Sequence, residues 1–334
     1  MPILDKKDKV QVAKYNEFIR NREQVSITQD YAFLVSNKSN DFEIVYLEKN
    51  GYIVASMAVL IVDILKKKKV FYCNNGPVCD IYDINVVKEL INELQPLVKK
   101  HNPIYLVMEP KVEKEDKLNL LYKKHKYKID TKAKLNRQIV LNIAGKTEEQ
   151  IISGLNDKTK YNLETSQKKN VKIKISTTKR DFEKFLELYK SEKQLQIQDI
   201  KNFEMFKGLL SSFDEDVIRV YTASIDGKVL GGAIATRFGK AVRCLEEVFI
   251  KESNATYART KLHFEIIKWG LENNCDIYEM GILDDKLEAD ARFKEGFTSK
   301  TGVVEYVGKI YKIYNKPMYI LNKIKKLEEY NDKF

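Results

Sequence analysis

The chain has 334 residues, of which 43% are hydrophobic and 32% are charged, which is enough apolar sequence for two buried cores and excludes a disordered or fibrous chain. No apolar run reaches the roughly 18 residues that a membrane-spanning helix needs, and we expect no signal peptide at the charged N-terminus. The four cysteines form no C-x-x-C pair and lack histidines at zinc-ligand spacing, so we expect a reduced cytoplasmic protein without a metal site.

The net charge of +11 is concentrated in one part of the chain. Between Lys99 and Arg180 there are 21 basic and 9 acidic residues, so the remainder is close to neutral. A basic stretch favours a polyanionic partner, such as nucleic acid, nucleotide phosphates or anionic lipid. The alternative is the solvated surface of a lysine-rich protein, which the ratio of 50 lysines to 9 arginines favours.

The first half of the chain predicts a mixed α/β unit. Two strands flank Asn50-Gly51, a dipeptide that favours the turns joining antiparallel strands. Apolar positions between residues 85 and 100 recur with the period of a helix. The strands expected here are Phe42–Leu47, Tyr52–Val62, Val70–Cys73, Ile104–Met108 and Gln138–Leu141, and the helices are Asn85–Lys100 and Lys117–His125.

The second half predicts a similar series of elements. The helices expected here are Glu148–Gly154, Lys158–Lys169, Asp181–Lys193, Ile200–Ser212, Thr260–Asn273, one leading to Lys294, and one near Pro317–Glu329. The expected strands are Ile218–Ser224, Val229–Arg237, Ala241–Phe249, Ile277–Met280 and Val303–Val307.

The two halves contain an internal repeat. The hairpin of residues 45–58 parallels that of residues 220–234, and each is followed by a strand, a long helix and another strand. This order is typical of an N-acetyltransferase-type (GNAT) unit. We therefore predict an α/β (α+β) protein of two tandem GNAT-like domains with mixed sheets. Domain 1 covers residues 1–142 together with a C-terminal helix at 315–334, and domain 2 covers residues 143–314.

Neither half carries the loop with which a GNAT enzyme binds coenzyme A. That loop needs glycines, because its backbone N–H groups must approach the pyrophosphate closely. The loop of residues 251–259 contains no glycine, and the loop of residues 74–78 contains one glycine beside Pro77, which has no N–H to donate. The sequence therefore predicts the acyltransferase fold without the usual acyl donor.

Several segments resemble one known family in their order and spacing. They are Phe71–Val78, Leu106–Pro110, Gln138–Leu141, Lys158–Leu163, Lys168–Ile173, Tyr278–Ile282 and Arg292–Phe297. With Gln29–Asn37 they make nearly the whole chain resemble the Fem-type aminoacyltransferases. The chain has no long heptad run, so it resembles the compact members that lack a coiled-coil arm.

This resemblance implies a tRNA-dependent aminoacyltransferase. Such an enzyme adds an amino acid from aminoacyl-tRNA to the stem peptide of a peptidoglycan precursor and builds the interpeptide bridge. The implied partners are aminoacyl-tRNA and the precursor, either UDP-MurNAc-pentapeptide or lipid II, with no cofactor. A soluble precursor would be met in the cytoplasm, whereas lipid II would bring the protein into peripheral contact with the inner face of the membrane. We expect a monomer.

The resemblance assigns three catalytic residues. Lys294 is the cation that would stabilise the oxyanion formed when an amine attacks the aminoacyl ester, and Phe293 would shape the adjacent surface. Glu109 ends a buried strand before a proline, where the family has aspartate, and would accept a proton from the attacking ammonium or orient it. The alternatives are a solvated lysine at a helix end and a surface carboxylate at a strand end.

A second set of residues is predicted to bind the acceptor. The phosphate-contacting lysine of the family falls on Asn37, with Lys38 next to it, and the corresponding arginine falls near Lys201. The tyrosine that follows in the family falls on Met205, so the acceptor pocket is altered. The full set expected to bind substrate is Asn37, Lys38, Tyr105, Lys201, Gly231 and Gly232, the two glycines because they permit close approach of the backbone.

A third set is predicted to bind the tRNA. Lys158, Lys160, Lys168 and Lys169 recur on and after one helix, and backbone charge supplies most of the affinity for nucleic acid. A solvated helix face is an equally good interpretation. On the long helix of the second half, we expect Trp269 to be a core residue and His263 to be a structural histidine.

Two other functions remain open from the sequence. One is a GNAT-like N-acyltransferase that uses a thioester donor, which acetyl-CoA binding would support and the missing glycine-rich loop disfavours. The other is a non-catalytic RNA-binding module, which the Phe293-Lys294 pair disfavours.

Overall fold

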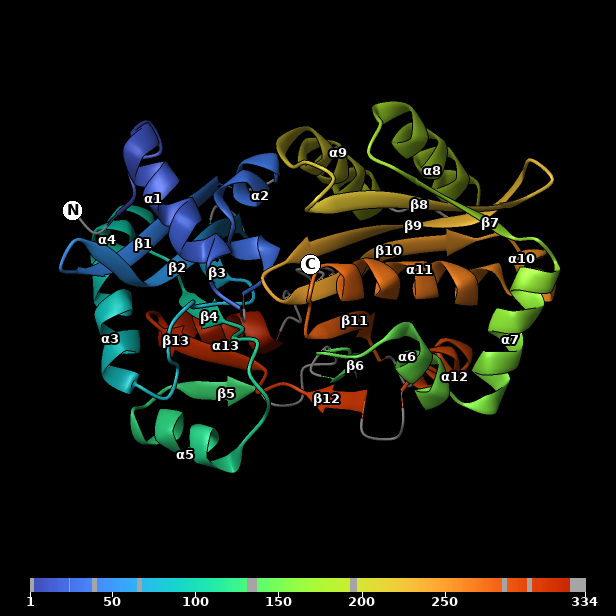
Figure 1. The fold of residues 1–334 in the computed structure, drawn as a ribbon. Coiled ribbons are helices and arrows are strands. Elements are labelled where there is room, and N and C mark those ends of the chain that lie inside the picture. The colour runs from blue at the N-terminus through green and yellow to red at the C-terminus, as the bar shows by residue number, and fades with distance from the viewer. Residues whose placement is uncertain are drawn as a thin grey trace. The chain divides into compact units, whose positions relative to one another are not determined.

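The computed structural model describes residues 3–23, 25–37, 41–64, 68–130, 137–192, 197–283, 287–298 and 302–324 (Figure 1). The chain divides into two compact units. The first consists of Met1–Asn136 and Glu305–Phe334, and the second of Arg137–Val304. In the described parts of the chain, none of the helices is both long and apolar enough to cross a membrane.

The first unit is built on a mixed sheet with the strand order β1-β2-β3-β4-β13-β5. β3 and β4 are parallel, and the other neighbours are antiparallel. The strands are β1 (Asp41–Lys49), β2 (Tyr52–Asp63), β3 (Lys69–Cys73), β4 (Tyr105–Met108), β5 (Lys128–Asp130) and β13 (Lys309–Ile313). The helices are α1 (Lys9–Arg20), the short 3₁₀ helix at Ile27–Gln29, α2 (Tyr31–Ser36), α3 (Ile84–Glu93), α4 (Gln95–His101), α5 (Asp116–Lys124) and α13 (Lys316–Ile324).

Local signals explain most of these elements. Asn50 and Gly51 both have positive φ, as the predicted hairpin turn between β1 and β2 requires. The helix expected at 85–100 is broken at Leu94, where α3 ends and α4 begins. Pro96 lies in the first turn of α4, where its missing N–H is tolerated, whereas one continuous helix would place it in the interior.

The second unit contains a sheet with the order β12-β6-β11-β10-β9-β8-β7. Figure 1 shows α8 and α9 on one face of this sheet and α11 on the other. The strands are β6 (Arg137–Asn142), β7 (Lys172–Ser176), β8 (Ile218–Ile225), β9 (Lys228–Phe238), β10 (Ala241–Phe249), β11 (Ile277–Ile282) and β12 (Val303–Glu305). The helices are α6 (Glu148–Gly154), α7 (Asp157–Lys168), α8 (Lys179–Glu192), α9 (Ile197–Ser212), α10 (Ser253–Thr256), α11 (Ala258–Glu272) and α12 (Glu288–Glu295).

The predicted tandem arrangement is confirmed. In the first unit a hairpin, a strand, a helical segment and a parallel strand follow one another as β1, β2, β3, α3–α4 and β4. In the second unit the same order appears as β8, β9, β10, α11 and β11. Trp269 on α11 is 1% exposed within the core of the second unit, as expected.

The unit boundaries differ from the expected ones at two places. β6 pairs with β11, so the second unit begins at residue 137 rather than 143. The chain returns to the first unit at residue 305 rather than 315, because β13 inserts between β4 and β5. The sequence pattern did not predict the strand β13, and it did not predict α1, α2, β5 or β7 either.

The central parallel strands of the second unit separate along their length. β10 and β11 pair only from Ala241 to Arg243, although β10 continues to Phe249. Beyond that point both strands have irregular registers with their other neighbours, between Cys244 and Glu246 in β10 and between Glu279 and Ile282 in β11. Two residues beyond this point, Glu247 on β10 and Ile282 on β11, belong to the candidate site described below.

Candidate functional site

Lys294 is a buried cation near the end of α12. It is 8% exposed, and its Nζ donates a hydrogen bond to the backbone oxygen of Ile282 at 3.0 Å. Nζ also pairs with Oδ2 of Asp290, one turn earlier on the same helix, at 2.8 Å. Gly281 has φ of +86°, and a Cβ there would lie 4.0 Å from Nζ. Lys294 is therefore held in place by β11 and α12, and the alternative of a solvated lysine is wrong.

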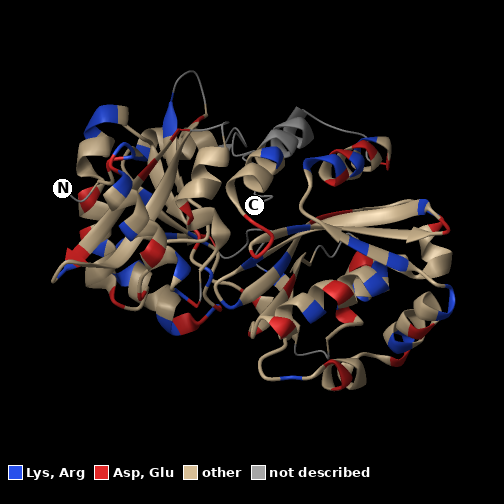
Figure 2. Cartoon of the chain, turned by 45° about the horizontal axis from the view of Figure 1, so that its top comes forward, with Lys and Arg blue, Asp and Glu red and all other residues tan. Residues whose placement is uncertain are grey.

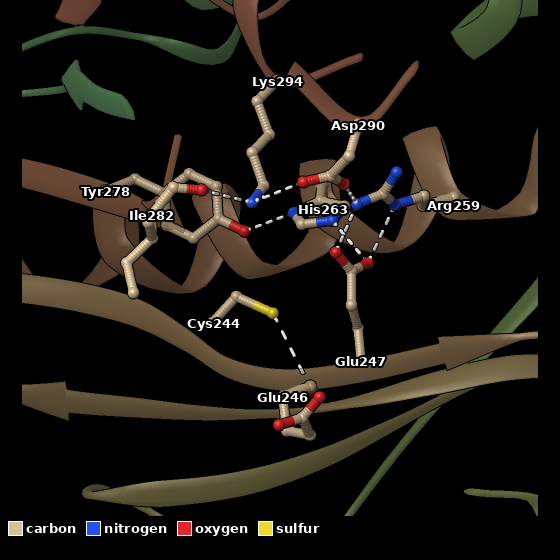
Figure 3. Close-up of polar contacts among 9 residues, drawn as sticks. All are labelled: Cys244, Glu246, Glu247, Arg259, His263, Tyr278, Ile282, Asp290 and Lys294. Carbon is tan, nitrogen blue, oxygen red and sulfur yellow. Dashed lines mark hydrogen bonds and ion pairs between the residues drawn. The ribbon is translucent and has the colours of Figure 1, made fainter. Parts of the chain in front are cut away.

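Asp290 also binds a second cation, Arg259 of α11 (Figure 3). The Arg259 guanidinium donates to both carboxylate oxygens of Glu247 on β10, with its Nε 2.9 Å from Oε2. It also lies 3.8 Å from the centre of the Phe293 ring. One arginine thus joins β10, α11 and α12 through charge-assisted hydrogen bonds and a cation–π contact.

His263, in the interior of the second unit, also belongs to this polar network. It is fully buried, with one ring nitrogen bonded to the Tyr278 hydroxyl and Nε2 at 3.0 Å from Oε2 of Glu247. Both nitrogens are therefore partnered within the protein. This confirms the expectation of a structural histidine, although its partner Glu247 also binds Arg259.

The charges in this network shift the pKa values of its carboxylates. Burial by itself would raise the pKa of Glu247, but the positive charge of Arg259 and the hydrogen bonds from Arg259 and His263 outweigh it and bring the pKa well below its usual value. Burial likewise acts to raise the pKa of Asp290, and Arg259 and Lys294 outweigh it, so the net shift is downward. Both carboxylates are ionised near neutral pH, which balances the two cations.

Phe293 is half-buried beside Lys294 and packs against several aromatic rings. Its ring centre lies 5.3 Å from that of His263 and 5.4 Å from that of Phe297. With Arg259 on it, the ring forms part of the wall around the ion network. The structure therefore places Phe293 and Lys294, both predicted to be catalytic, in one site.

The segment after β10 differs from a coenzyme A cradle. It contains the short helix α10, and Tyr257 precedes α11 with φ of +54°. Its residues from Lys251 to Arg259 include no glycine. Arg259, at the start of α11, points its guanidinium to Glu247 and Asp290 rather than leaving it for an external phosphate.

Glu109, the third residue predicted to be catalytic, lies in the first unit, immediately after β4. It accepts a hydrogen bond from the Tyr72 hydroxyl, and its Oε1 lies 3.2 Å from Nζ of Lys309 on β13. Lys309 Nζ is also 5.6 Å from the centre of the Tyr72 ring. The Glu109 and Lys309 side chains are 20% and 17% exposed, so this is a largely buried group and the alternative of a surface carboxylate is wrong.

Tyr105 lies next to this group but within a packed cluster. It is 4% exposed, and its ring centre is 5.5 Å from those of both Tyr311 and Tyr319. Its hydroxyl accepts a hydrogen bond from Asn322 at 3.4 Å. It also lines a small pocket of about 30 Å³ with Ile64, Val70, Tyr72, Val107, Lys309 and Tyr311. This burial leaves little of the Tyr105 ring for a substrate.

A larger pocket of about 530 Å³ lies in the first unit. The residues after β3 and β4 form two of its walls. It is lined by Asn21, Arg22, Glu23, Val54, Asn75, Pro77, Val78, Cys79, Asp80, Ile81, Pro110, Lys111 and Val112. Several of these belong to the segments 71–78 and 106–110, which carry the family resemblance.

The substrate role predicted for Gly231 and Gly232 on β9 is not supported. A Cβ at Gly231 would lie 2.0 Å from the Phe249 ring, and one at Gly232 would lie 2.7 Å from the backbone oxygen of Tyr221 and 3.0 Å from the Phe185 ring. Both glycines are buried. The space that they leave is filled by side chains of the same unit, so their role is in packing.

The other residues predicted to bind the acceptor are only partly described. Asn37 caps the C-terminus of α2, its N–H donating to the Phe33 oxygen, and it is half-buried. Lys38 lies outside the described residues, as does the side chain of Lys201 on α9. Met205, at the position of the family's tyrosine, is 5% exposed and therefore a core residue.

The lysines predicted to bind tRNA lie on and just after α7. Lys158, Lys168 and Lys169 are exposed, whereas Lys160 is half-buried, 4.0 Å from Asp157. Lys169 Nζ donates to the Ala255 backbone oxygen at 2.6 Å, which joins the end of α7 to α10. Figure 2 shows basic and acidic positions interspersed over the elements of both units, so charge alone does not mark this helix.

Sequence reasoning missed the partners of the predicted residues. Asp290 could have been found, because a carboxylate four residues before Lys294 lies on the same face of a helix. The sequence places Arg259 only at the end of a segment without glycine. Nothing local marks Glu247 or the contact of Lys309 with Glu109, since each joins segments far apart in the sequence.

Comparison with known proteins finds similarity in both units. The model of the FemAB family matches residues 10–119, and that of an acetyltransferase (GNAT) domain matches residues 157–295. The chain is 25% identical to the UDP-N-acetylmuramoylpentapeptide-lysine N(6)-alanyltransferase of Weissella viridescens, over 96% of this chain and 98% of that protein. It is 26% identical to aminoacyltransferase FemB of Staphylococcus epidermidis, over 54% of this chain and 48% of that protein.

The structural comparison gives the same fold. A crystal structure of FemX superposes with a TM-score of 0.80 at 13% identity, and the match covers 96% of this chain and 99% of that one. The FemAB match lies in the first unit and the GNAT match in the second, and the Weissella alanyltransferase is similar over both. The chain is therefore similar to the Fem aminoacyltransferases along nearly its whole length, and its fold is that of two tandem GNAT-like domains.

Proposed function

We propose that this protein transfers an amino acid from aminoacyl-tRNA to the stem peptide of a peptidoglycan precursor. The observation that carries the proposal is the buried Lys294 ammonium, fixed by Asp290 and the Ile282 oxygen beside Phe293. It is supported by similarity along nearly the whole chain to an enzyme named for alanyl transfer to the lysine of UDP-N-acetylmuramoylpentapeptide.

The chemistry of this transfer needs a fixed cation and a proton acceptor. The acceptor amine attacks the ester carbonyl carbon, the bond to the ribose oxygen breaks, and an amide replaces the ester. Negative charge accumulates on the carbonyl oxygen in the transition state, and an ammonium already in place stabilises it without reorganisation. Lys294 would provide that charge. The proton released by the amine would finally reach the ribose hydroxyl that leaves.

Glu109 is the proposed partner of the acceptor amine. Its carboxylate is oriented by the Tyr72 hydroxyl and by Lys309, so it is held ready to bind an ammonium group or to accept its proton. We propose that the pocket of about 530 Å³ in the same unit holds part of the precursor, because it is lined by the residues that follow β3 and β4. Asn37, Lys38 and Lys201 remain proposed contacts of the precursor phosphates.

The donor would be bound by the second unit through α7. Lys158, Lys168 and Lys169 present exposed ammonium groups there, and Lys160 lies beside them. Tyr161 on the same helix is 60% exposed, and its ring centre lies 6.1 Å from that of Tyr257. Ammonium groups beside an exposed tyrosine suit the phosphates and bases of an RNA end.

The place of the reaction follows from its substrates. Aminoacyl-tRNA is cytoplasmic, so we propose that the protein acts in the cytoplasm as a monomer. A lipid-linked acceptor would bring it to the inner face of the membrane.

The decisive experiment measures aminoacyl transfer directly. The protein is incubated with a set of charged tRNAs and with UDP-MurNAc-pentapeptide or lipid II, and the precursor is analysed by mass spectrometry. We expect a mass increase of one aminoacyl residue on a precursor. Transfer from acetyl-CoA instead, or no transfer to either precursor from any tRNA, contradicts the proposal.

A further inference from the structure

We propose that Asp290 is a positioning residue for Lys294 and that Arg259 fixes Asp290 in turn. The inference rests on the proposed transfer reaction, in which Lys294 stabilises the oxyanion. Lysine is a flexible point charge with three donors, so its side chain does not by itself hold one position. Neighbouring residues must therefore hold the Lys294 ammonium in position before the carbonyl oxygen of the aminoacyl ester binds beside it.

The acceptors around Lys294 fix it from two elements. Among the described residues, its Nζ is bonded to Asp290 of α12 at 2.8 Å and to the Ile282 oxygen of β11 at 3.0 Å. An ammonium has three N–H donors, so one remains for a ligand. Gly281 lies beside Nζ, and because it has no side chain it does not obstruct a ligand that approaches Nζ from this side.

Asp290 is itself held by a second cation. Its Oδ2 faces Lys294, while its Oδ1 accepts from Nη2 of Arg259. Arg259 is anchored by two hydrogen bonds to Glu247 and by its contact with the Phe293 ring. A guanidinium has a planar fork of donors, so it can bind two carboxylates in fixed directions, which a lysine at the same place cannot do.

The network is electrically balanced and largely buried. Two carboxylates, Glu247 and Asp290, face two cations, Arg259 and Lys294, with side-chain exposures between 10% and 28%. Taken as a whole, a buried ion-pair network adds little to the free energy of folding, because desolvation offsets the attraction, although removing one partner alone is destabilising. We therefore infer that the network serves to hold the remaining N–H donor of Lys294 in place, rather than to stabilise the folded protein.

Helix α12 provides a matched control on the same helix. Arg292 and Glu288 form an ion pair at the same i,i+4 spacing as Lys294 and Asp290, but their side chains are 73% and 76% exposed. Exposed pairs of this type have little energetic effect. The two pairs share a helix and a spacing and differ in whether they lie in the site.

The main test compares Asp290→Asn with Glu288→Gln in the transfer assay, using intact protein, aminoacyl-tRNA and the precursor on which the wild type acts. Asp290→Asn keeps the shape of the side chain and removes its charge. We expect its kcat to fall about tenfold or more, with KM for both substrates nearly unchanged, and Asp290→Glu to recover part of the loss. Glu288→Gln should match the wild type. An unchanged kcat in Asp290→Asn, or equal losses in the Asn and Glu variants, overturns the inference.

A double variant tests whether Asp290 acts through Lys294. In the Lys294→Met background, adding Asp290→Asn should lower kcat no further, because the residue to be positioned is already gone. Losses that multiply in the double variant would show that Asp290 acts independently. If Asp290→Asn does not fold, Arg259→Lys replaces it: this variant keeps the charge but loses the fork, and we expect a similar fall in kcat, whereas wild-type kcat overturns the inference.

The outcome also separates this inference from the proposed function. If the wild-type protein transfers no aminoacyl group, the proposed function itself is contradicted. If the wild type transfers the group, Lys294→Met is impaired and Asp290→Asn is not, the proposed function holds and only the positioning role of Asp290 is contradicted.

Discussion

Lys294 and Asp290 form an ion pair of 2.8 Å one turn apart on α12, with the lysine only 8% exposed. The same spacing at a protein surface is common and nearly neutral in energy. Here the pair is joined to Arg259 and Glu247, so it belongs to the interior of the second unit. The ion pair with Asp290 therefore holds the ammonium group of Lys294 in one position, where it is available to a reaction.

Replacement of Lys294 by methionine should abolish most of the turnover. Removing one donor from an oxyanion site typically lowers kcat by about 10² to 10³. We expect kcat of Lys294→Met to fall within this range, while the dissociation constant of the precursor, measured by calorimetry, changes little. Arg292→Met on the exposed face of α12 is the control, and we expect it to retain wild-type turnover. Equal turnover in both variants would remove Lys294 from the mechanism.

Glu109→Gln should impair the acceptor side of the reaction. The amide still accepts from Tyr72 but no longer carries the charge that faces Lys309 and, in our proposal, the acceptor amine. We expect a fall in kcat of about 10² or more, the usual contribution of a general base. The matched control is Glu305→Gln, which breaks the more exposed pair with Lys114 in the same unit and should leave kcat unchanged.

The stability of the protein should fall with acidification in a way that depends on Glu247. The folded-state pKa of Glu247 and that of Asp290 lie below their usual values. The stabilisation that comes from a lowered carboxyl pKa is fully present above the unfolded value of about 4.3 and is lost as the pH falls through the folded value.

Urea unfolding between pH 7 and pH 3 measures this dependence. We expect Glu247→Gln to be less stable than the wild type at pH 7 and to lose less stability below about pH 5. Glu288→Gln, which alters an exposed carboxylate, should follow the wild type. Parallel curves for Glu247→Gln and the wild type would contradict the assignment of the shift to Glu247.

Gly232→Ala should destabilise the second unit without altering the candidate site. The new methyl group would lie 2.7 Å from the Tyr221 oxygen, which cannot move without disturbing β8. Overpacking of this kind costs about 1–3 kcal/mol. Gly154→Ala, where nothing lies within 4 Å, is the control for thermal unfolding. A lowered Tm with normal KM for the precursor supports packing, whereas a normal Tm with raised KM would restore the substrate role.

The role of α7 should be visible in the salt dependence of tRNA use. In Lys158→Gln/Lys168→Gln we expect a higher KM for aminoacyl-tRNA, and a plot of log KM against log salt less steep by up to about one per lysine. The control is Lys179→Gln/Lys184→Gln, two exposed lysines on α8. If both double variants show the wild-type slope, the basic stretch is a solvated surface.

Much of the fold could be predicted because its signals are local. Asn50-Gly51 predicts the first hairpin from its turn preference, and the apolar spacing of residues 260–273 predicts α11. The repeat of hairpin, strand, helix and strand gave the tandem architecture. Strands with weak patterns were missed, such as β7, which has little burial, and β13, which reaches its place only by pairing with β4 and β5.

For the candidate site, the sequence by itself determined which residues to consider, and the tertiary structure decided what surrounds them. Lys294, Phe293 and Glu109 are implied by the resemblance of short segments to the Fem-type aminoacyltransferases. Whether Lys294 is solvated or buried depends on Glu247 and Arg259, which come from β10 and α11 and meet Asp290 only after the chain has folded. The two glycines of β9 were predicted to bind substrate, but the structure gives them a packing role. The Phe249 ring beside Gly231 comes from the neighbouring strand β10, and the Phe185 ring beside Gly232 comes from α8. Periodicity and turn preference act over a few residues, whereas burial and charge pairing are set by packing between distant segments, and packing determined the chemistry available at this site.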